Sequence, residues 1–120
     1  MNDNQLSGTI PREIAKLRNL NVLEASGNKL TGNLPSTIGL MQNLDKILLH
    51  DNKISNTIPS EIGNLSNLRY LRLGTNELIG SIPPEIFAHT NLTFFDVSNN
   101  KLTGSIPSEI GQCDRLLIRE

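Results

Sequence analysis

The sequence predicts an α/β solenoid, a stack of short coils that each add one strand to a shared parallel sheet. Four residue types recur at steps of 24 along the 120-residue chain. Each unit combines an alternating apolar pattern, typical of a strand, with proline and glycine, which end a helix. A unit of this length cannot bury its own apolar side chains, so neighbouring units must share one core. The recurring positions are Pro11, Pro35, Pro59, Pro83 and Pro107; Asn4, Asn28, Asn52, Asn76 and Asn100; Ile14, Ile38, Ile62, Ile86 and Ile110; and Leu20, Leu44, Leu68, Leu92 and Leu116.

One domain is expected over residues 1–120. Each open end of this array would expose several aliphatic side chains, on the order of 10 kcal/mol of lost burial, whereas a whole domain is stable by only about 5–15 kcal/mol. We therefore expect the chain to be part of a longer array or to cover its ends by self-association. After Leu116 the apolar pattern fails, because the 24-residue step from Phe95 would place Arg119 at an inward-facing position of the next strand. The full repeats are 17–40, 41–64, 65–88 and 89–112, and the partial repeats are 1–16 and 113–120.

Strands are expected where apolar residues alternate with polar ones. In the repeat 65–88, Leu71 and Leu73 are two residues apart and flank Arg72, so one face is buried and the other is wet. The equivalent apolar pairs are Leu23 and Ala25, Ile47 and Leu49, and Phe95 and Val97.

The rest of each unit predicts a turn and a return segment. Asn76 follows the strand, and its amide can both donate and accept, so stacked asparagines can form a ladder along the solenoid. Gly80 permits positive φ, as do Gly8, Gly32 and Gly104, and Asn56 takes that place in one repeat. Pro83 prevents a long helix, so we expect a short 3₁₀ turn with Ile86 packed inside. Proline and glycine within every unit disfavour the alternative, a purely helical repeat.

The unit LSNLRYLRLGTNELIGSIPPEIFA and its neighbours fit the pattern LxxLxxLxLxxNxLxGxIPxxIGxL. This pattern resembles plant-type leucine-rich repeats, found in the ectodomains of receptor-like kinases, in receptor-like proteins and in polygalacturonase-inhibiting proteins. The resemblance implies a right-handed coil with short parallel β-strands on the concave face and 3₁₀ turns and loops on the convex side. Phe87 and His89 replace the family's usual glycine and leucine. The paired-cysteine caps common in the family and any kinase signature are not present in this sequence.

The same resemblance implies a non-enzymatic module that binds a protein or peptide ligand, or a co-receptor, in signalling or defence, outside the cell or at the plasma membrane. A stand-alone inhibitor or adaptor, similar to the polygalacturonase-inhibiting proteins, is the alternative. An enzyme is the third class, and no residue pattern supports it. His50 and His89 have no carboxylate or cysteine at metal-ligand spacing, so no catalytic residue, metal or cofactor is predicted.

Composition narrows the partners further. Lysine and arginine number 11 against 12 aspartates and glutamates, so the net charge is −1 and nothing favours nucleic acid. No apolar run approaches the roughly 18 residues of a membrane helix. The polar N-terminus lacks the features of a signal peptide.

When the repeats are aligned, the residues at outward-facing strand positions differ from repeat to repeat. The residues at the recurring leucine, asparagine, proline and isoleucine positions stay the same. We expect the ligand to bind at the outward-facing positions, on the concave face, with Tyr70 and Phe94 adjacent in one column and Arg72 and Asp96 adjacent in the next. The alternative is that solvent tolerates any residue, that the aromatic pair is an ordinary cross-strand contact and that Arg72 and Asp96 form a surface ion pair worth little. The predicted contact residues are Lys46, Leu48, His50, Tyr70, Arg72, Phe94 and Asp96.

Four weaker signals remain. Glutamates recur on the return segments and are interpreted as a solvated acidic ridge on the convex side: Glu13, Glu61, Glu85 and Glu109. Cys113 is expected to be a small buried hydrophobe, with a reactive thiol as the alternative. Two sequons, at Asn64 and Asn91, are candidate glycosylation sites if the protein is secreted, although about two would arise by chance.

Overall fold

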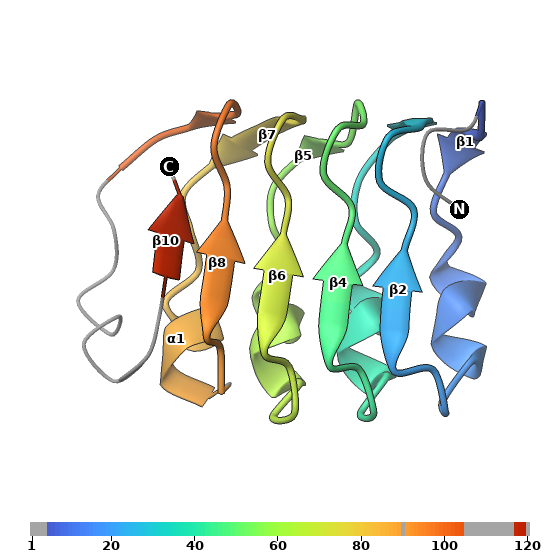
Figure 1. The fold of residues 1–120 in the computed structure, drawn as a ribbon, viewed down its shortest axis with the longest axis vertical. Coiled ribbons are helices and arrows are strands. Elements are labelled where there is room, and N and C mark those ends of the chain that lie inside the picture. Colours follow the sequence, from blue (N-terminus) through green and yellow to red (C-terminus); the bar gives the residue numbers. More distant parts are fainter. Residues whose placement is uncertain (1–4, 90, 105–116, 120) are drawn as a thin grey trace.

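In a computed structural model, which describes residues 5–89, 91–104 and 117–119, the chain forms a stack of similar coils (Figure 1). Each coil adds a strand to a parallel sheet, turns, adds a second short strand and returns through a short helix behind the sheet. The prediction of a solenoid with parallel strands on one face and helical turns on the other is confirmed.

The central sheet has the strand order β10-β8-β6-β4-β2, with every pair parallel. Sequential coils therefore lie side by side, as expected when each coil stacks on the one before. The middle residues Ile47, Leu71 and Phe95 are buried, and their neighbours along each strand point outward. The strands are β2 (Val22–Glu24), β4 (Lys46–Leu48), β6 (Tyr70–Arg72), β8 (Phe94–Asp96) and β10 (Leu117–Arg119).

One prediction about this sheet is wrong. In the pairing of β10 with β8, Ile118 lies opposite Phe95 and Arg119 lies opposite Asp96. The last step is thus 23 residues, from Phe94 to Leu117, and not 24. A slip of one residue exchanges the two faces of a strand. The core register position therefore goes to an isoleucine, and Arg119 is not on the core column.

The second strands form the rim of the stack, beyond a tight turn. β1 pairs with β3, and β5, β7 and β9 form a second parallel group. The predicted positive φ angles are confirmed, from 77° at Gly32 to 88° at Gly8, with 64° at Asn56. The strands are β1 (Ser7–Thr9), β3 (Lys29–Thr31), β5 (Ser55–Asn56), β7 (Glu77–Gly80) and β9 (Lys101–Leu102).

Three return segments are 3₁₀ helices, as predicted: η1 (Arg12–Lys16), η2 (Ser36–Leu40) and η3 (Ser60–Asn64). Each begins directly after a proline in extended conformation, because proline cannot donate to a preceding turn. Glycine inside η2 and η3 lets the coils approach closely, whereas η1 has Ala15 at the same place. A Cβ atom on Gly39 would lie 2.5 Å from the backbone oxygen of Glu61, closer than any side chain allows.

The fourth return segment, α1 (Glu85–His89), is a short α-helix, so the 3₁₀ prediction is wrong there. The amide of Ala88 donates to the carbonyl of Pro84, an i→i−4 bond of 3.2 Å. Phe87 replaces the close-packing glycine of the two preceding coils, Gly39 and Gly63, and its ring is buried edge-on to Phe95, with centroids 5.1 Å apart. The Phe87 ring is too large for the space that glycine leaves between coils and packs in the core. The return segment that carries it is α-helical.

The asparagine ladder is confirmed in four coils. The Nδ2 of Asn76 donates to the carbonyls of Leu73 in its own coil (3.0 Å) and Leu49 in the preceding coil (3.1 Å). Its Oδ1 accepts from the amide of Ile54, at 3.0 Å. Each rung therefore satisfies backbone groups that the turns leave without partners. Asn52 and Asn100 repeat all three contacts, Asn28 repeats those to its own coil and to the amide of Leu6, and Asn4 lies outside the described residues.

The core is a continuous apolar column between the sheet and the helices. Leu71, Leu73, Leu78 and Ile86 are all fully buried, which confirms their predicted inward positions. At the N-terminal end of the stack, Leu23 is only partly buried. The inward face of the sheet therefore packs on a buried aliphatic core, which holds the strands and their outward side chains in place.

Candidate functional site

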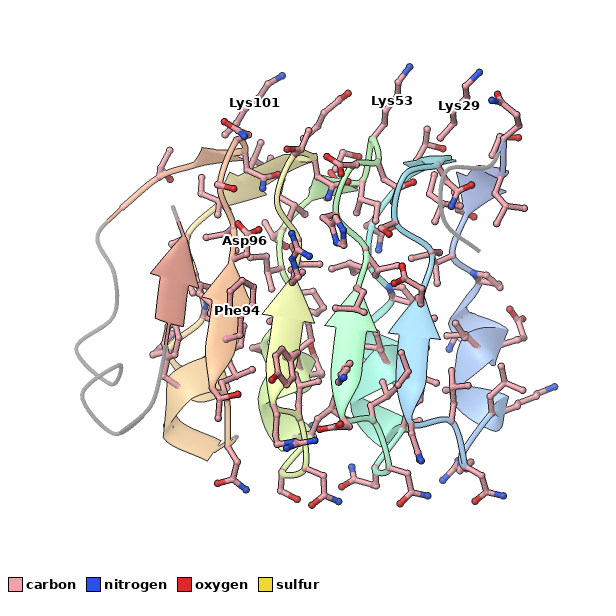
Figure 2. The ribbon with its side chains drawn as sticks, viewed as in Figure 1. Lys29, Lys53, Phe94, Asp96 and Lys101 are labelled. Atoms are coloured by element: carbon pink, nitrogen blue, oxygen red, sulfur yellow. The ribbon has the colours of Figure 1, made fainter. Side chains whose placement is uncertain are left out.

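The central sheet brings the seven predicted contact residues together on and just after neighbouring strands. Figure 2 labels two of them, Phe94 and Asp96. Lys46, Tyr70 and Phe94 lie opposite one another in register on β4, β6 and β8. A second row lies two residues further along the same strands and runs through Leu48, Arg72 and Asp96. His50 follows β4. We call these seven residues the sheet-face cluster.

The first row is aromatic and flanked by cations. The rings of Tyr70 and Phe94 have centroids 6.2 Å apart, and both residues are partly exposed. The Nζ of Lys46 lies 5.0 Å from the Tyr70 ring centroid, and the guanidinium carbon of Arg72 lies 5.7 Å from that of Phe94. These distances are within the range of cation–π attraction. The row thus presents flat apolar rings and positive charge at the same place.

Asp96 differs from the prediction, because its carboxylate is not at the surface. The residue is only 3% exposed, and its Oδ1 accepts from the amide of Ser98 (3.0 Å) and from the Ser98 hydroxyl (2.7 Å). Gly74 of the neighbouring coil makes room for this group, since a Cβ there would lie 2.9 Å from Oδ1. The predicted ion pair with Arg72 is present, but its aspartate is buried instead of lying at the surface.

Arg72 is correspondingly short of partners. Its Nε lies 3.7 Å from Asp96 Oδ2, which is ion-pair range but too long for a hydrogen bond. Within the described part of the chain this Nε is buried without a hydrogen-bond partner, and so is the Nδ1 of His50. Within the described residues Lys46 makes no side-chain hydrogen bond; it contacts the Tyr70 ring and lies near enough to Asp45 to help lower the pKa of that carboxylate. The Nε of Arg72 is itself buried, but the Arg72 side chain is 34% exposed, so the exposed parts of Arg72 and Lys46 can meet a carboxylate from outside.

Glu24 on β2 is held in the same way as Asp96. Its Oε1 accepts from the amide of Ser26 (2.9 Å) and from the Ser26 hydroxyl (2.7 Å). Burial raises the pKa of Glu24, but the two bonds from Ser26 and the nearby His50 outweigh burial and lower the pKa below its ordinary value. One oxygen of the carboxylate, Oε1, is therefore engaged by a residue just beyond its own strand.

An ion pair beside the cluster was missed by the sequence analysis. Arg69 donates from Nε to Asp45 Oδ1 (2.6 Å) and from its terminal nitrogen to Oδ2 (2.8 Å). The hydrogen bond from Arg69 lowers the pKa of Asp45 below its ordinary value. Arg69 also lies 5.9 Å from the ring of Tyr70. Opposite charges 24 residues apart, directly before two strands, were the signal that could have revealed the pair.

A second asparagine ladder was also missed. The Nδ2 atoms of Asn43, Asn67 and Asn91 donate to backbone carbonyls of the preceding coil, at 2.9, 3.2 and 2.8 Å. These bonds tie together the loops that lead into the strands. The 24-residue spacing of these asparagines, which starts at Asn19, was visible in the sequence.

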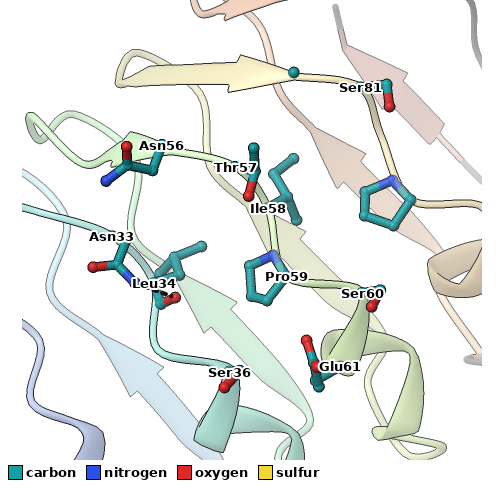
Figure 3. Close-up of a pocket in the computed structure, with 12 residues that line it drawn as sticks. Asn33, Leu34, Ser36, Asn56, Thr57, Ile58, Pro59, Ser60, Glu61 and Ser81 are labelled. Atoms are coloured by element: carbon teal, nitrogen blue, oxygen red, sulfur yellow. Dashed lines mark hydrogen bonds between the residues drawn. The ribbon is translucent and has the colours of Figure 1, made fainter.

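The flank of the stack carries a groove between neighbouring return segments (Figure 3). Its volume is about 750 Å³, and its lining includes Asn33, Asn56 and Pro59, with Glu61 as a charged member. None of the residues that line the groove belongs to the sheet-face cluster.

The remaining predicted features can be placed in part. Glu13, Glu61 and Glu85 are exposed on the return segments, whereas Glu109, Cys113 and the side chain of His89 lie outside what the structure describes. Among the described side chains, no three histidines, cysteines, aspartates or glutamates gather in a way that could hold a metal ion. Over the same residues, no helix has the length and apolar character needed to cross a bilayer.

Known proteins match the chain by sequence model and by structure. Residues 42–102 match one leucine rich repeat model, and residues 19–41 match a second. The structure of a plant peptide hormone receptor, RGFR1 in complex with RGF2, is similar with a TM-score of 0.91 and 44% identity, over 94% of this chain and 18% of that one. No curated protein sequence matches significantly.

Two Arabidopsis receptor kinases are similar as well. HAESA, in complex with the peptide hormone IDA and the co-receptor SERK1, has a TM-score of 0.91 and 39% identity, over 98% of this chain and 20% of that one. The ectodomain of SOBIR1 has a TM-score of 0.87 and 33% identity, over 96% of this chain and 62% of that one. The chain therefore spans about a fifth of the length of RGFR1 and HAESA.

Proposed function

Because the chain belongs to the leucine-rich-repeat family, we propose that it is a non-enzymatic binding module whose sheet-face cluster holds an extended protein or peptide segment. The single observation behind this proposal is the aromatic and cationic row formed by Lys46, Tyr70 and Phe94, next to the hydrogen-bond-deficient Arg72. Aromatic and arginine side chains are the residues most often found at the energetic centres of interfaces.

The charge arrangement suggests what the bound segment looks like. The carboxylates around the cluster are already occupied: Glu24 by Ser26, Asp45 by Arg69, and Asp96 chiefly by its serine. The cations of the cluster are not similarly satisfied, so a partner gains more from offering a carboxylate than from offering an ammonium group. An apolar side chain beside that carboxylate would cover the aromatic rings.

The similar proteins support the same class of partner. RGFR1 and HAESA are described in complex with peptide ligands, and HAESA also with a co-receptor. We extend both kinds of partner to this chain, together with a location outside the cell or at the plasma membrane and a role in signalling or defence. We also propose that two copies of the chain can associate through the ends of the stack.

The test uses a displayed library of random linear peptides, selected on the purified chain. Enriched peptides are then titrated, by fluorescence polarisation, against the wild type and against a double variant, Tyr70→Ala with Phe94→Ala. Truncating two such anchors costs about 2–4 kcal/mol, so affinity should fall at least tenfold. The matched control, Glu61→Ala with Glu85→Ala, changes two exposed convex residues and should keep wild-type affinity.

Circular dichroism establishes that each variant is folded before its affinity is compared. Peptides that bind the double variant as tightly as the wild type would dismiss the sheet-face cluster as the binding site. Enriched peptides without acidic residues would dismiss the predicted charge of the partner while leaving the site in place.

A further inference from the structure

The two sequons lie at different kinds of position in the coil. Asn64 is the last residue of η3, and Asn91 lies in the loop that leads into β8. Both residues are exposed, so exposure alone does not separate them as acceptors of a glycan. The partners of their amide nitrogens do.

The amide of Asn91 has a structural role. Its Nδ2 donates to the backbone oxygen of Ser66 at 2.8 Å, as the third rung of the ladder formed by Asn43 and Asn67. The hydroxyl of Thr93, the third residue of this sequon, donates to the backbone oxygen of Arg69 at 3.3 Å. The nitrogen that would carry a sugar therefore faces the preceding coil, and both polar side chains of the sequon are occupied.

Asn64 is exposed to solvent at the end of η3. Among the described residues, its side-chain amide makes no hydrogen bond. The residues at the same place in the two preceding coils, Lys16 and Leu40, are exposed as well, and Leu40 is 49% exposed. The third residue of the sequon, Ser66, is also exposed. A large substituent on this nitrogen would extend into solvent without displacing a neighbouring coil.

We propose that Asn64 is the attachment site of an N-linked glycan and that Asn91 stays unmodified as a ladder residue. In this reaction the Asn64 Nδ2 bonds to the first sugar carbon of a lipid-linked oligosaccharide, and the bond from that carbon to the lipid pyrophosphate breaks. The nitrogen loses one proton to the transferase, and the lipid pyrophosphate departs. The glycan would lie on the helix side of the solenoid, behind the sheet in Figure 1, and leave the sheet-face cluster clear.

This inference rests on the proposed extracellular location, and its test separates the two. The chain is secreted from insect cells behind an added, cleavable signal peptide, so modification does not depend on where the native protein resides. Treatment with a peptide N-glycosidase in heavy-oxygen water converts each glycosylated asparagine to a mass-labelled aspartate. The label should appear at Asn64 and not at Asn91. The glycan mass should be lost in Asn64→Gln and kept in Asn91→Gln.

A second measurement applies if a variant is not secreted. Folded chain from bacteria is incubated with a purified oligosaccharyltransferase and lipid-linked oligosaccharide, alongside synthetic peptides that contain each sequon. Both peptides should be modified, whereas the folded chain should be modified at Asn64 alone. In urea, Asn91→Gln should lower the unfolding midpoint and Asn64→Gln should leave it unchanged. Modification of Asn91 to the same extent as Asn64, or none at Asn64, would overturn the proposal in either format.

Discussion

Removing one rung of the asparagine ladder should cost a large share of the stability of the chain. Asn76 is 8% exposed and lies in the middle of the described stack. Its Nδ2 donates to Leu49 and Leu73, with Gly74 at 3.3 Å, and its Oδ1 accepts from Ile54. The substitution Asn76→Ala removes all of these contacts and adds none.

The size of the loss follows from the groups left behind. An intramolecular hydrogen bond contributes about 0.5–1.5 kcal/mol net, and a buried group left without a partner costs about 1–3 kcal/mol. The amide of Ile54 loses the acceptor that Asn76 supplies, whereas the carbonyls of Leu49 and Leu73 each keep a second donor, from Asn52 and Asn100. One unpaired amide and two lost hydrogen bonds should together lower the free energy of unfolding by about 2–4 kcal/mol. Asn76→Asp should cost more than alanine, because a carboxylate keeps the acceptor for Ile54 but faces two carbonyl oxygens.

The assay is urea unfolding followed by circular dichroism. With a slope of about 1–3 kcal/mol per M, the midpoint should fall by roughly 2 M. The control Asn33→Ala removes an exposed asparagine with one long local bond, of 3.3 Å, and should change stability by less than about 0.5 kcal/mol. A loss below about 1 kcal/mol for Asn76→Ala, with an unchanged slope, would refute the ladder as a main source of stability.

Three further outcomes are expected. Gly63→Ala should destabilise the chain by about 1–3 kcal/mol, because the new Cβ would lie 2.7 Å from the backbone oxygen of Glu85; thermal unfolding tests this, and an unchanged melting temperature would contradict it. Thr75→Asn should stabilise the chain by about 1 kcal/mol, because the β-branched threonine has a φ of 54°, where asparagine is less strained; urea unfolding should show a higher midpoint. The lowered pKa of Asp45 means that its bond with Arg69 adds stability above the ordinary pKa of 3.8, and that this stability is lost as pH falls through the lower folded pKa. The difference in unfolding free energy between wild type and Arg69→Gln should therefore shrink to zero in strong acid, and a difference that grows there would contradict the assignment.

Much of the fold could be predicted from the columns of the sequence. Asn76, Gly80 and Leu71 each have equivalent residues 24 positions away in the neighbouring repeats. In the structure they lie in the ladder, in a turn with positive φ and in the core, as predicted. The α-helix at Glu85–His89 was not predicted, because the consequence of Phe87 depends on a ring finding space beside Phe95. The position of Arg119 was not predicted either, since register is decided by pairing with β8 and not by spacing.

The candidate site was predicted in its location but not in its chemistry. The outward columns of the strands identify Tyr70 and Phe94 as neighbours, and their rings are indeed close. A charged residue on that face can already be bound by another residue of the chain. Whether it is bound depends on side chains two residues further along the chain or in the adjacent coil. Asp96 is bound by Ser98, in a space that Gly74 leaves open.

The repeat, the parallel sheet, the ladder and the set of residues that share one face could all be predicted from the amino-acid sequence. This was possible because those features repeat, and one physical arrangement must satisfy every copy. The packing of the coils sets which carboxylates are engaged by neighbouring residues. Among the described residues it also leaves the Nε of Arg72 without a hydrogen bond and the amide of Asn64, unlike that of Asn91, without a partner. These properties are set by the particular neighbour in the adjacent coil, which differs from repeat to repeat and follows no period.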